Sequence, residues 1–165
     1  MAISAAAHNP KVRAAVLISA ASIGHRFAGF KPEDRDKAIA LYFDRVNPVD
    51  LLPLAGATPA VLRAEIFDHR REWDFIALAP ALGKRPVLLI TADDGTGPNS
   101  EALFQFLKQA GNTQSARVEI KTDHPFSDRR IALESTITNW LDQQGFPSAC
   151  ALILACHLVQ SNVSS

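Results

Sequence analysis

The sequence predicts an α/β fold in which parallel strands alternate with helices. Three apolar runs rich in β-branched residues carry this prediction, at residues 12–18, 86–91 and 117–121. Amphipathic stretches follow the second and the third run, with apolar residues at helical spacing. Because crossovers between parallel strands are right-handed, we expect the three strands to be neighbours in sequence order, with helices on both faces of the sheet.

The chain opens with an alanine-rich stretch over residues 2–8, which predicts a short helix ended by Asn9-Pro10. The first strand is expected from Val12 to Ile18. From Ser22 to Lys84 the pattern changes to helices and loops, which is long for a crossover whose usual minimum is about ten to twelve residues. We interpret residues 22–84 as a helical, lid-like insertion.

Proline positions mark two helices inside this insertion. Pro32-Glu33-Asp34 opens an amphipathic stretch that runs through Val46. Thr58-Pro59 supplies an N-cap and a first-turn proline for the next helix. We therefore expect the insertion to consist of helices joined by loops.

Two further helices follow the second and third strands. The first is predicted from about Ser100 to Ala110 and ends at Gly111. The last is predicted from about Asp128 to Gln144 and ends at Gly145. Its spacing predicts that it buries four apolar side chains, Leu133, Ile137, Trp140 and Leu141.

Charge and cysteine content exclude several classes of protein. Seventeen basic residues balance seventeen acidic ones in 165 residues, and no long run of like charges occurs. Nucleic acids and anionic membranes are therefore not expected as partners, and a small neutral substrate or a protein fits better. Cys150 and Cys156 form neither a disulfide framework nor a zinc motif, and we expect no cofactor or metal. The first residues do not form a signal peptide, so cytoplasm is the default location.

Residues 146–165 do not belong to the α/β pattern. Residues 150–159 form an apolar run of about ten residues, too short to span a membrane core that needs roughly twenty. An appended tail is the leading interpretation, ahead of a docking helix and a membrane contact.

The acid-then-histidine order of two strand ends is the most informative feature for function. Asp94 follows the second strand and His124 follows the third. In open parallel sheets the carboxyl ends of the strands are where chemistry is placed. We expect the carboxylate of Asp94, or of its neighbour Asp93, to lie within hydrogen-bond distance of the His124 ring. Two adjacent acids are also compatible with a magnesium site, although no further acid follows at a corresponding strand end.

Three segments together resemble the C-terminal half of α/β-hydrolase-fold serine hydrolases, close to the esterase and prolyl-oligopeptidase-like branches. Residues 6–18 look like the end of the helix after the nucleophile elbow and the strand that follows it. Residues 73–90 look like the segment that leads into the acid-bearing strand, and residues 123–127, Asp-His-Pro-Phe-Ser, look like the histidine loop. Taking Pro98 as the loop proline of the family favours Asp94 as the acid.

The resemblance covers residues 1–145 and implies a partial α/β-hydrolase fold. It implies hydrolysis of an ester, amide or peptide bond, with His124 as general base and Asp94 as the residue that orients it. No Gly-x-Ser-x-Gly elbow occurs in the sequence. The nucleophile and the first five strands of that fold would lie upstream, so we expect this fragment to be inactive alone. The alternative is a non-catalytic binding or interaction protein.

The remaining candidates are weaker. Ser19 ends the first strand, but Ala20-Ala21-Ser22 lacks the glycines that permit a strained nucleophile turn. The other four histidines share no spacing, and we expect surface or capping roles for them: His8, His25, His69 and His157. An open edge at the first strand favours a homo-oligomer.

Overall fold

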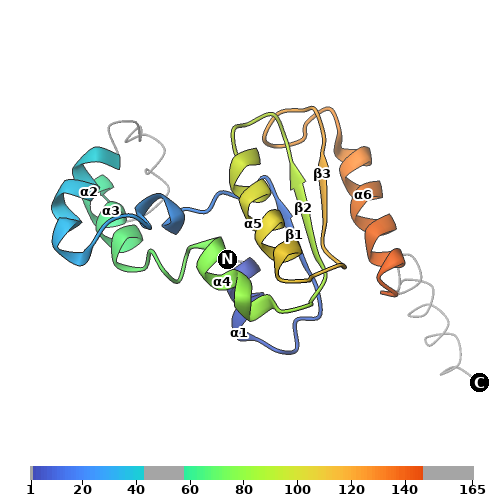
Figure 1. Cartoon of the computed structure of the whole chain (residues 1–165). Helices are drawn as coiled ribbons and strands as arrows, with labels where there is room; N and C mark the ends of the chain where they lie inside the picture. Colours follow the sequence, from blue (N-terminus) through green and yellow to red (C-terminus); the bar gives the residue numbers. More distant parts are fainter. Residues whose placement is uncertain (1, 43–57, 147–165) are drawn as a thin grey trace, which may run out of the picture.

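The computed structural model describes residues 2–42 and 58–146, and within them the chain is an α/β protein (Figure 1). The strands are β1 (Ala15–Ile18), β2 (Val87–Thr91) and β3 (Ala116–Glu119). The α-helices are α1 (Ala2–His8), α2 (Arg35–Tyr42), α3 (Pro59–Asp68), α4 (Phe75–Leu82), α5 (Gly97–Gln109) and α6 (Arg130–Gln143). Two 3-10 helices are η1 (Gly24–Phe27) and η2 (Pro32–Asp34).

The three strands form one parallel sheet in the order β1-β2-β3, which confirms the predicted order. Ala15 of β1 is paired with Val87 of β2, and Thr91 at the end of β2 is paired with Glu119 of β3. β1 is shorter than predicted, because the N–H of Val12 donates to the carbonyl of Asn9 at 3.1 Å and continues the turn after α1.

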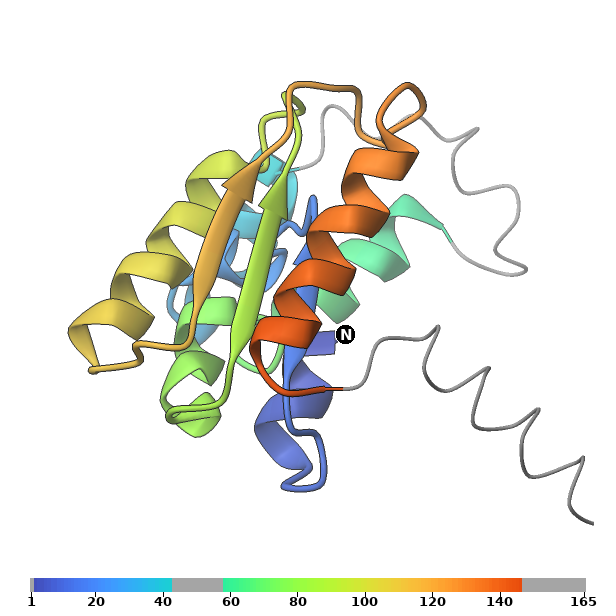
Figure 2. The same cartoon turned by 90° about the vertical axis from the view of Figure 1, so that its right-hand side faces the viewer.

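Helices cover both faces of the sheet, as expected (Figure 2). On one face α1, α4 and α5 pack against β1 and β2 around buried Leu17, Leu89 and Leu103. On the other face α6 packs through Trp140 against Leu88 of β2. Each fully buried Leu, Ile or Val contributes about 1.5–3 kcal/mol through the hydrophobic effect. The side chains of β2 are the centre of both cores, since all five are buried.

Helix α5 begins earlier than its predicted start near Ser100. Pro98 lies in its first turn, where its missing N–H costs no hydrogen bond. The carbonyl of Thr96 accepts the N–H groups of Asn99 and Ser100 at 3.1 and 3.4 Å, which places the start of the helix at Gly97. Gly111 follows the helix with φ 77°, as expected for a glycine stop.

Helix α6 begins later than its predicted start at Asp128 and buries less than predicted. The preceding residues form a turn in which the N–H of Arg129 donates to the carbonyl of Phe126 at 3.1 Å. Only Trp140 of the four predicted core residues is buried, and Leu133, Ile137 and Leu141 are half-buried. The single covering helix on this face leaves those side chains partly open to solvent. Gly145 has φ 73°, in agreement with the predicted glycine stop.

The segment between β1 and β2 packs in two places. Helices η1, α2 and α3 form a core of their own around Phe27, Ala38 and Phe67, beside the sheet in Figure 1. The rings of Phe27 and Phe67 lie 5.6 Å apart in an edge-to-face arrangement. Helix α4 instead packs against α1 and α5. The side chain of Thr58 caps α3 by accepting the N–H of Val61 at 3.2 Å, as predicted.

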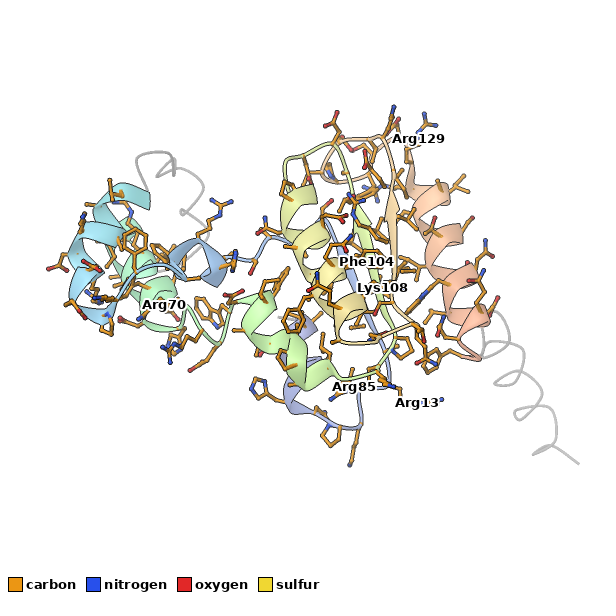
Figure 3. All side chains as sticks on the ribbon, in the orientation of Figure 1. Arg13, Arg70, Arg85, Phe104, Lys108 and Arg129 are labelled. Carbon is orange, nitrogen blue, oxygen red and sulfur yellow. The ribbon has the colours of Figure 1, made fainter. Side chains whose placement is uncertain are left out.

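Two polar side chains tie the turns together at the amino ends of the strands. Arg85, labelled in Figure 3, donates to the carbonyls of Ala6 and Ala81 near the ends of α1 and α4, where a cation is favoured. Asn112 is fully buried and donates to the carbonyl of Arg85 at 2.9 Å, while its own carbonyl accepts the N–H of Ser115 at 3.0 Å. These contacts fix the turn before β2 against the turn before β3.

The predicted tail at 146–165, apart from Phe146, lies outside the described residues, as do Cys150, Cys156 and the stretch from 43 to Val46. No helix in the described part of the chain is long and apolar enough to cross a membrane.

We predict that Gly24→Ala is destabilising, because η1 approaches the backbone before α4 too closely for a side chain. A Cβ at Gly24 would lie 2.0 Å from the carbonyl oxygen of Arg70 and 2.7 Å from the carbonyl carbon of Trp73. We expect a loss of about 3 kcal/mol in the free energy of unfolding, measured by urea denaturation. Gly29→Ala is the control, since nothing lies within 4 Å of its Cβ position. Equal stability of the two variants would contradict the close approach.

Candidate active site

Asp94 and His124 meet at the carboxyl edge of the sheet. The loops that follow β2 and β3 lie together at this end of the molecule (Figure 2). The Nδ1 atom of His124 lies 2.7 Å from the Oδ2 atom of Asp94. The two side chains are 30 residues apart in sequence, and the parallel pairing of β2 with β3 brings them together.

The Asp94 carboxylate is held in place by the turn that follows it. Its Oδ1 atom accepts the N–H of Thr96 at 2.9 Å and the hydroxyl of Thr96 at 2.7 Å, and Gly95 between them has φ 80°. Burial alone would raise the pKa of Asp94, whose side chain is 8% exposed. The hydrogen bonds from Thr96 and His124 outweigh burial and hold the pKa well below its ordinary value. The acid is therefore ionised at neutral pH.

Asp94, and not Asp93, contacts the imidazole. The N–H of Asp93 donates to the carbonyl of Thr122 at 3.1 Å and extends the pairing of β2 with β3 beyond the strands. The Asp93 residue is exposed, and its carboxylate makes no hydrogen bond within the described residues. This backbone contact sets which of the two adjacent acids faces the histidine loop.

The loop that carries His124 is fixed at both sides of the imidazole. Asp123 accepts the N–H of Ser127 at 2.8 Å, and this bond lowers the pKa of the Asp123 carboxyl. Phe126 has φ 56° and is buried in the core beneath α6. The hydroxyl of Thr122 donates to the carboxylate of Asp128. Arg129 ends the loop at the same end of the molecule (Figure 3).

The geometry defines which tautomer a neutral His124 ring adopts. An ionised carboxylate only accepts hydrogen bonds, so the proton of the neutral imidazole sits on Nδ1 and is donated to Asp94. Nε2 is then an unprotonated acceptor. It makes no hydrogen bond with the described residues, and the His124 side chain is 67% exposed. The pair can take up a proton at Nε2 and stabilise the resulting imidazolium.

Ser19 lies beside Asp94. It ends β1 with φ 42°, a strained backbone that the sequence argument from missing glycines did not anticipate. Its hydroxyl is buried and helps to lower the pKa of Asp94, although Oγ makes no hydrogen bond of standard geometry within the described residues. No hydrogen bond joins Ser19 to His124 in this part of the chain. Ser19 is thus placed to support the acid.

Three of the other histidines have polar contacts that their spacing in the sequence did not predict. His8 contacts the carbonyl of Ser4 at 2.8 Å, near the end of α1. His69 contacts Glu72 at 3.0 Å, and His25 contacts Asp74 at 3.1 Å. Sequence reasoning missed the last pair because its members are 49 residues apart. His157 lies outside the described residues.

The comparisons with known proteins give no match: no family model, no curated protein and no solved structure matches this chain.

We predict that Thr96→Val lowers stability in a pH-dependent way. The substitution removes the hydroxyl that donates to Asp94 and keeps the side-chain volume, so about 2 kcal/mol of unfolding free energy should be lost at pH 7. The Asp94 pKa is depressed in the folded state, so this contribution is full above the ordinary carboxyl value of about 3.9 and is lost as pH falls through the depressed pKa.

Urea denaturation of both proteins from pH 7 down to pH 3 measures this difference. Thr113→Val is the matched control, because Thr113 is exposed and makes no hydrogen bond in the described structure. If the stability lost in Thr96→Val grew as the pH fell, the hydrogen bond from Thr96 to an ionised Asp94 would be contradicted.

Proposed function

We propose that this chain is the C-terminal part of an α/β-hydrolase-fold serine hydrolase that acts on ester, amide or peptide bonds. The observation that carries the proposal is the 2.7 Å contact between Asp94 and His124, at the ends of adjacent parallel strands. The acid comes first in the chain and the histidine second, which is the order of the triad in that fold. The resemblance of residues 123–127 to the histidine loop of the family adds support.

In the proposed reaction His124 moves one proton. A serine from outside these 165 residues attacks the carbonyl carbon of the substrate, and Nε2 of His124 takes the hydroxyl proton. The imidazolium then gives this proton to the leaving alcohol or amine as the acyl–serine ester forms. Water, activated by the same nitrogen, releases the acid and regenerates the serine. Asp94 stabilises the imidazolium throughout and keeps the ring oriented.

The same proposal implies that the chain is inactive alone. The sequence contains no Gly-x-Ser-x-Gly elbow, and the strained Ser19 is buried on the side of the acid. Loss of the triad nucleophile in subtilisin lowers kcat by a factor on the order of 10⁶. A non-catalytic binding protein is the alternative function, and the experiment below separates the two.

We predict that joining this chain to the upstream half of a related serine hydrolase creates esterase activity and labelling by a fluorophosphonate probe. His124→Ala in the hybrid should then lower kcat by about 10⁶, and Asp94→Asn by about 10⁴, because histidine transfers the proton and the acid orients it. The isolated chain should show neither hydrolysis of p-nitrophenyl esters nor labelling.

Two matched variants make this test specific. His69→Ala removes a histidine that contacts an acid elsewhere, and Asp93→Asn removes the adjacent carboxylate; both should leave the activity of the hybrid unchanged. A folded hybrid without activity would support the binding protein instead. Labelling of the isolated chain at Ser19 or another serine would overturn the proposal.

The exposed edge of β1 is the place where the proposed upstream half would pair. β1 pairs with β2 on one side. The N–H of Ala15 donates to the carbonyl of Pro86, just before β2, at 3.1 Å, and the N–H of Ser19 donates to the carbonyl of Ile90 at 2.8 Å. Because these bonds alternate along a parallel strand, the backbone groups of Val16 and Ile18 face the other side. The outer edge of β3 is protected by the charged residues Arg117 and Glu119, whereas β1 is apolar throughout.

We predict that the isolated chain self-associates through this edge. Size-exclusion chromatography should show dimers or larger species whose fraction rises with concentration. Ile18→Lys places a charge at a position that is 41% exposed on the edge and should shift the chain toward monomer. Ile131→Lys, on α6 and 81% exposed, is the control. A monomer across a wide concentration range would count against the open edge.

A further inference from the structure

A second aspartate–histidine pair lies between η1 and α4. The Nδ1 atom of His25 is 3.1 Å from the Oδ2 atom of Asp74. The Asp74 side chain is 10% exposed, whereas that of His25 is 46% exposed. A carboxylate of low exposure therefore holds one ring nitrogen of an imidazole whose other nitrogen is open.

This pair is built into the fold. Oδ1 of Asp74 caps α4 by accepting the N–H of Ile76 at 2.9 Å, and it also accepts the hydroxyl of Ser22 at 3.3 Å. The oxygen of Ser22 in turn accepts the N–H of Phe75 at 2.9 Å. The N–H of Gly24 donates to the carbonyl of Trp73 at 3.1 Å. Both carboxylate oxygens of Asp74 thus have partners, and the orientation of His25 follows from them.

The imidazole borders a cavity of about 210 Å³ between η1, the start of α4 and the first turns of α5. Three apolar residues line it, Ile76, Pro98 and Ala102, together with three polar ones, Ser22, His25 and Asn99. Ser22 is already committed to Asp74 and the N–H of Phe75. The open hydrogen-bonding groups are Nε2 of His25 and the side-chain amide of Asn99, which makes no hydrogen bond within the described residues.

The chemistry of these groups selects a ligand class. With Nδ1–H donated to Asp74, Nε2 of a neutral His25 accepts a hydrogen bond, while the amide of Asn99 both donates and accepts. A carboxamide offers an N–H to the imidazole and a carbonyl to the Asn99 amide. The walls carry no acid or base apart from His25, whose partner is Asp74, so a charged ligand would lose its water without gaining a counter-ion.

We propose that this cavity is a binding site for a neutral carboxamide on a short branched alkyl group, held by His25 and Asn99. The site requires neither a nucleophile nor the chemistry of Asp94 and His124, so it stands apart from the proposed function. Its volume suits a small group, either as a free molecule or as one part of a larger ligand.

Titration of the ¹⁵N-labelled 165-residue chain with isobutyramide, followed by NMR, tests the site. We expect saturable shifts at the amides of His25, Ile76 and Asn99, with a Kd on the order of 1–10 mM for so small a ligand. Isobutyrate and isobutylammonium should bind at least about fivefold more weakly, because each carries a charge that the walls do not pair.

Two pairs of variants separate the site from general surface binding. His25→Ala should weaken isobutyramide about fivefold, the effect of one lost hydrogen bond, whereas His69→Ala should have no effect. His69 is a close match, since its Nδ1 also contacts an acid, at 3.0 Å, and its side chain is also 46% exposed. Ala102→Leu should fill the cavity and abolish binding, whereas Ala40→Leu on exposed α2 should not.

Absence of saturable shifts up to about 100 mM isobutyramide, an order of magnitude above the expected Kd, would remove the site. Binding that survives Ala102→Leu, or that is equally strong for isobutyrate, would assign the shifts to another surface. His25→Ala can also loosen η1, but Ala102→Leu leaves every polar contact of Asp74 in place and decides the case alone.

Discussion

Burial of β2 on both faces is the constraint on which the rest of the structure depends. All five of its side chains are buried and both of its edges are paired, so the strand is stable only inside a complete sheet with helices on either side. Helices α1, α4 and α5 supply one cover and α6 the other. The loop that leaves this strand carries Asp94. A strand that is buried along its whole length therefore positions the acid of the candidate site.

The two members of that site have opposite environments, and this asymmetry suits their proposed roles. The Asp94 carboxylate is 8% exposed and receives hydrogen bonds from Thr96 and His124, which favour its ionised form. The His124 ring is 67% exposed and leaves Nε2 free. An acid that only orients needs a fixed charge, whereas a base that transfers a proton needs access to substrate and water. Equal exposure of the Asp94 carboxylate and the His124 ring would suit neither orientation nor proton transfer.

Strands and their order could be predicted from sequence because β-branched runs and right-handed crossovers leave few alternatives. The choice of Asp94 over Asp93 was favoured only by the resemblance, through Pro98. The two residues themselves left it open, because it depends on the backbone contact between Asp93 and Thr122 in another strand's loop. The early start of α5 follows from the carbonyl of Thr96, a local contact without a distinct sequence signal. The positive φ of Ser19 was missed for a related reason, since tertiary packing imposes a conformation that its neighbours in sequence do not favour.

The pairs Asp94–His124 and Asp74–His25 show how one device can serve different ends. In each, a carboxylate of low exposure is fixed by N–H groups of the residues that follow it and accepts an imidazole from a distant segment. What differs is the surroundings of the free ring nitrogen. That of His124 opens to solvent at the sheet edge, whereas His25 borders a largely apolar cavity between three helices. Proton transfer needs the former setting and selective binding the latter, so the surroundings of Nε2, more than the pair itself, define what each histidine can do.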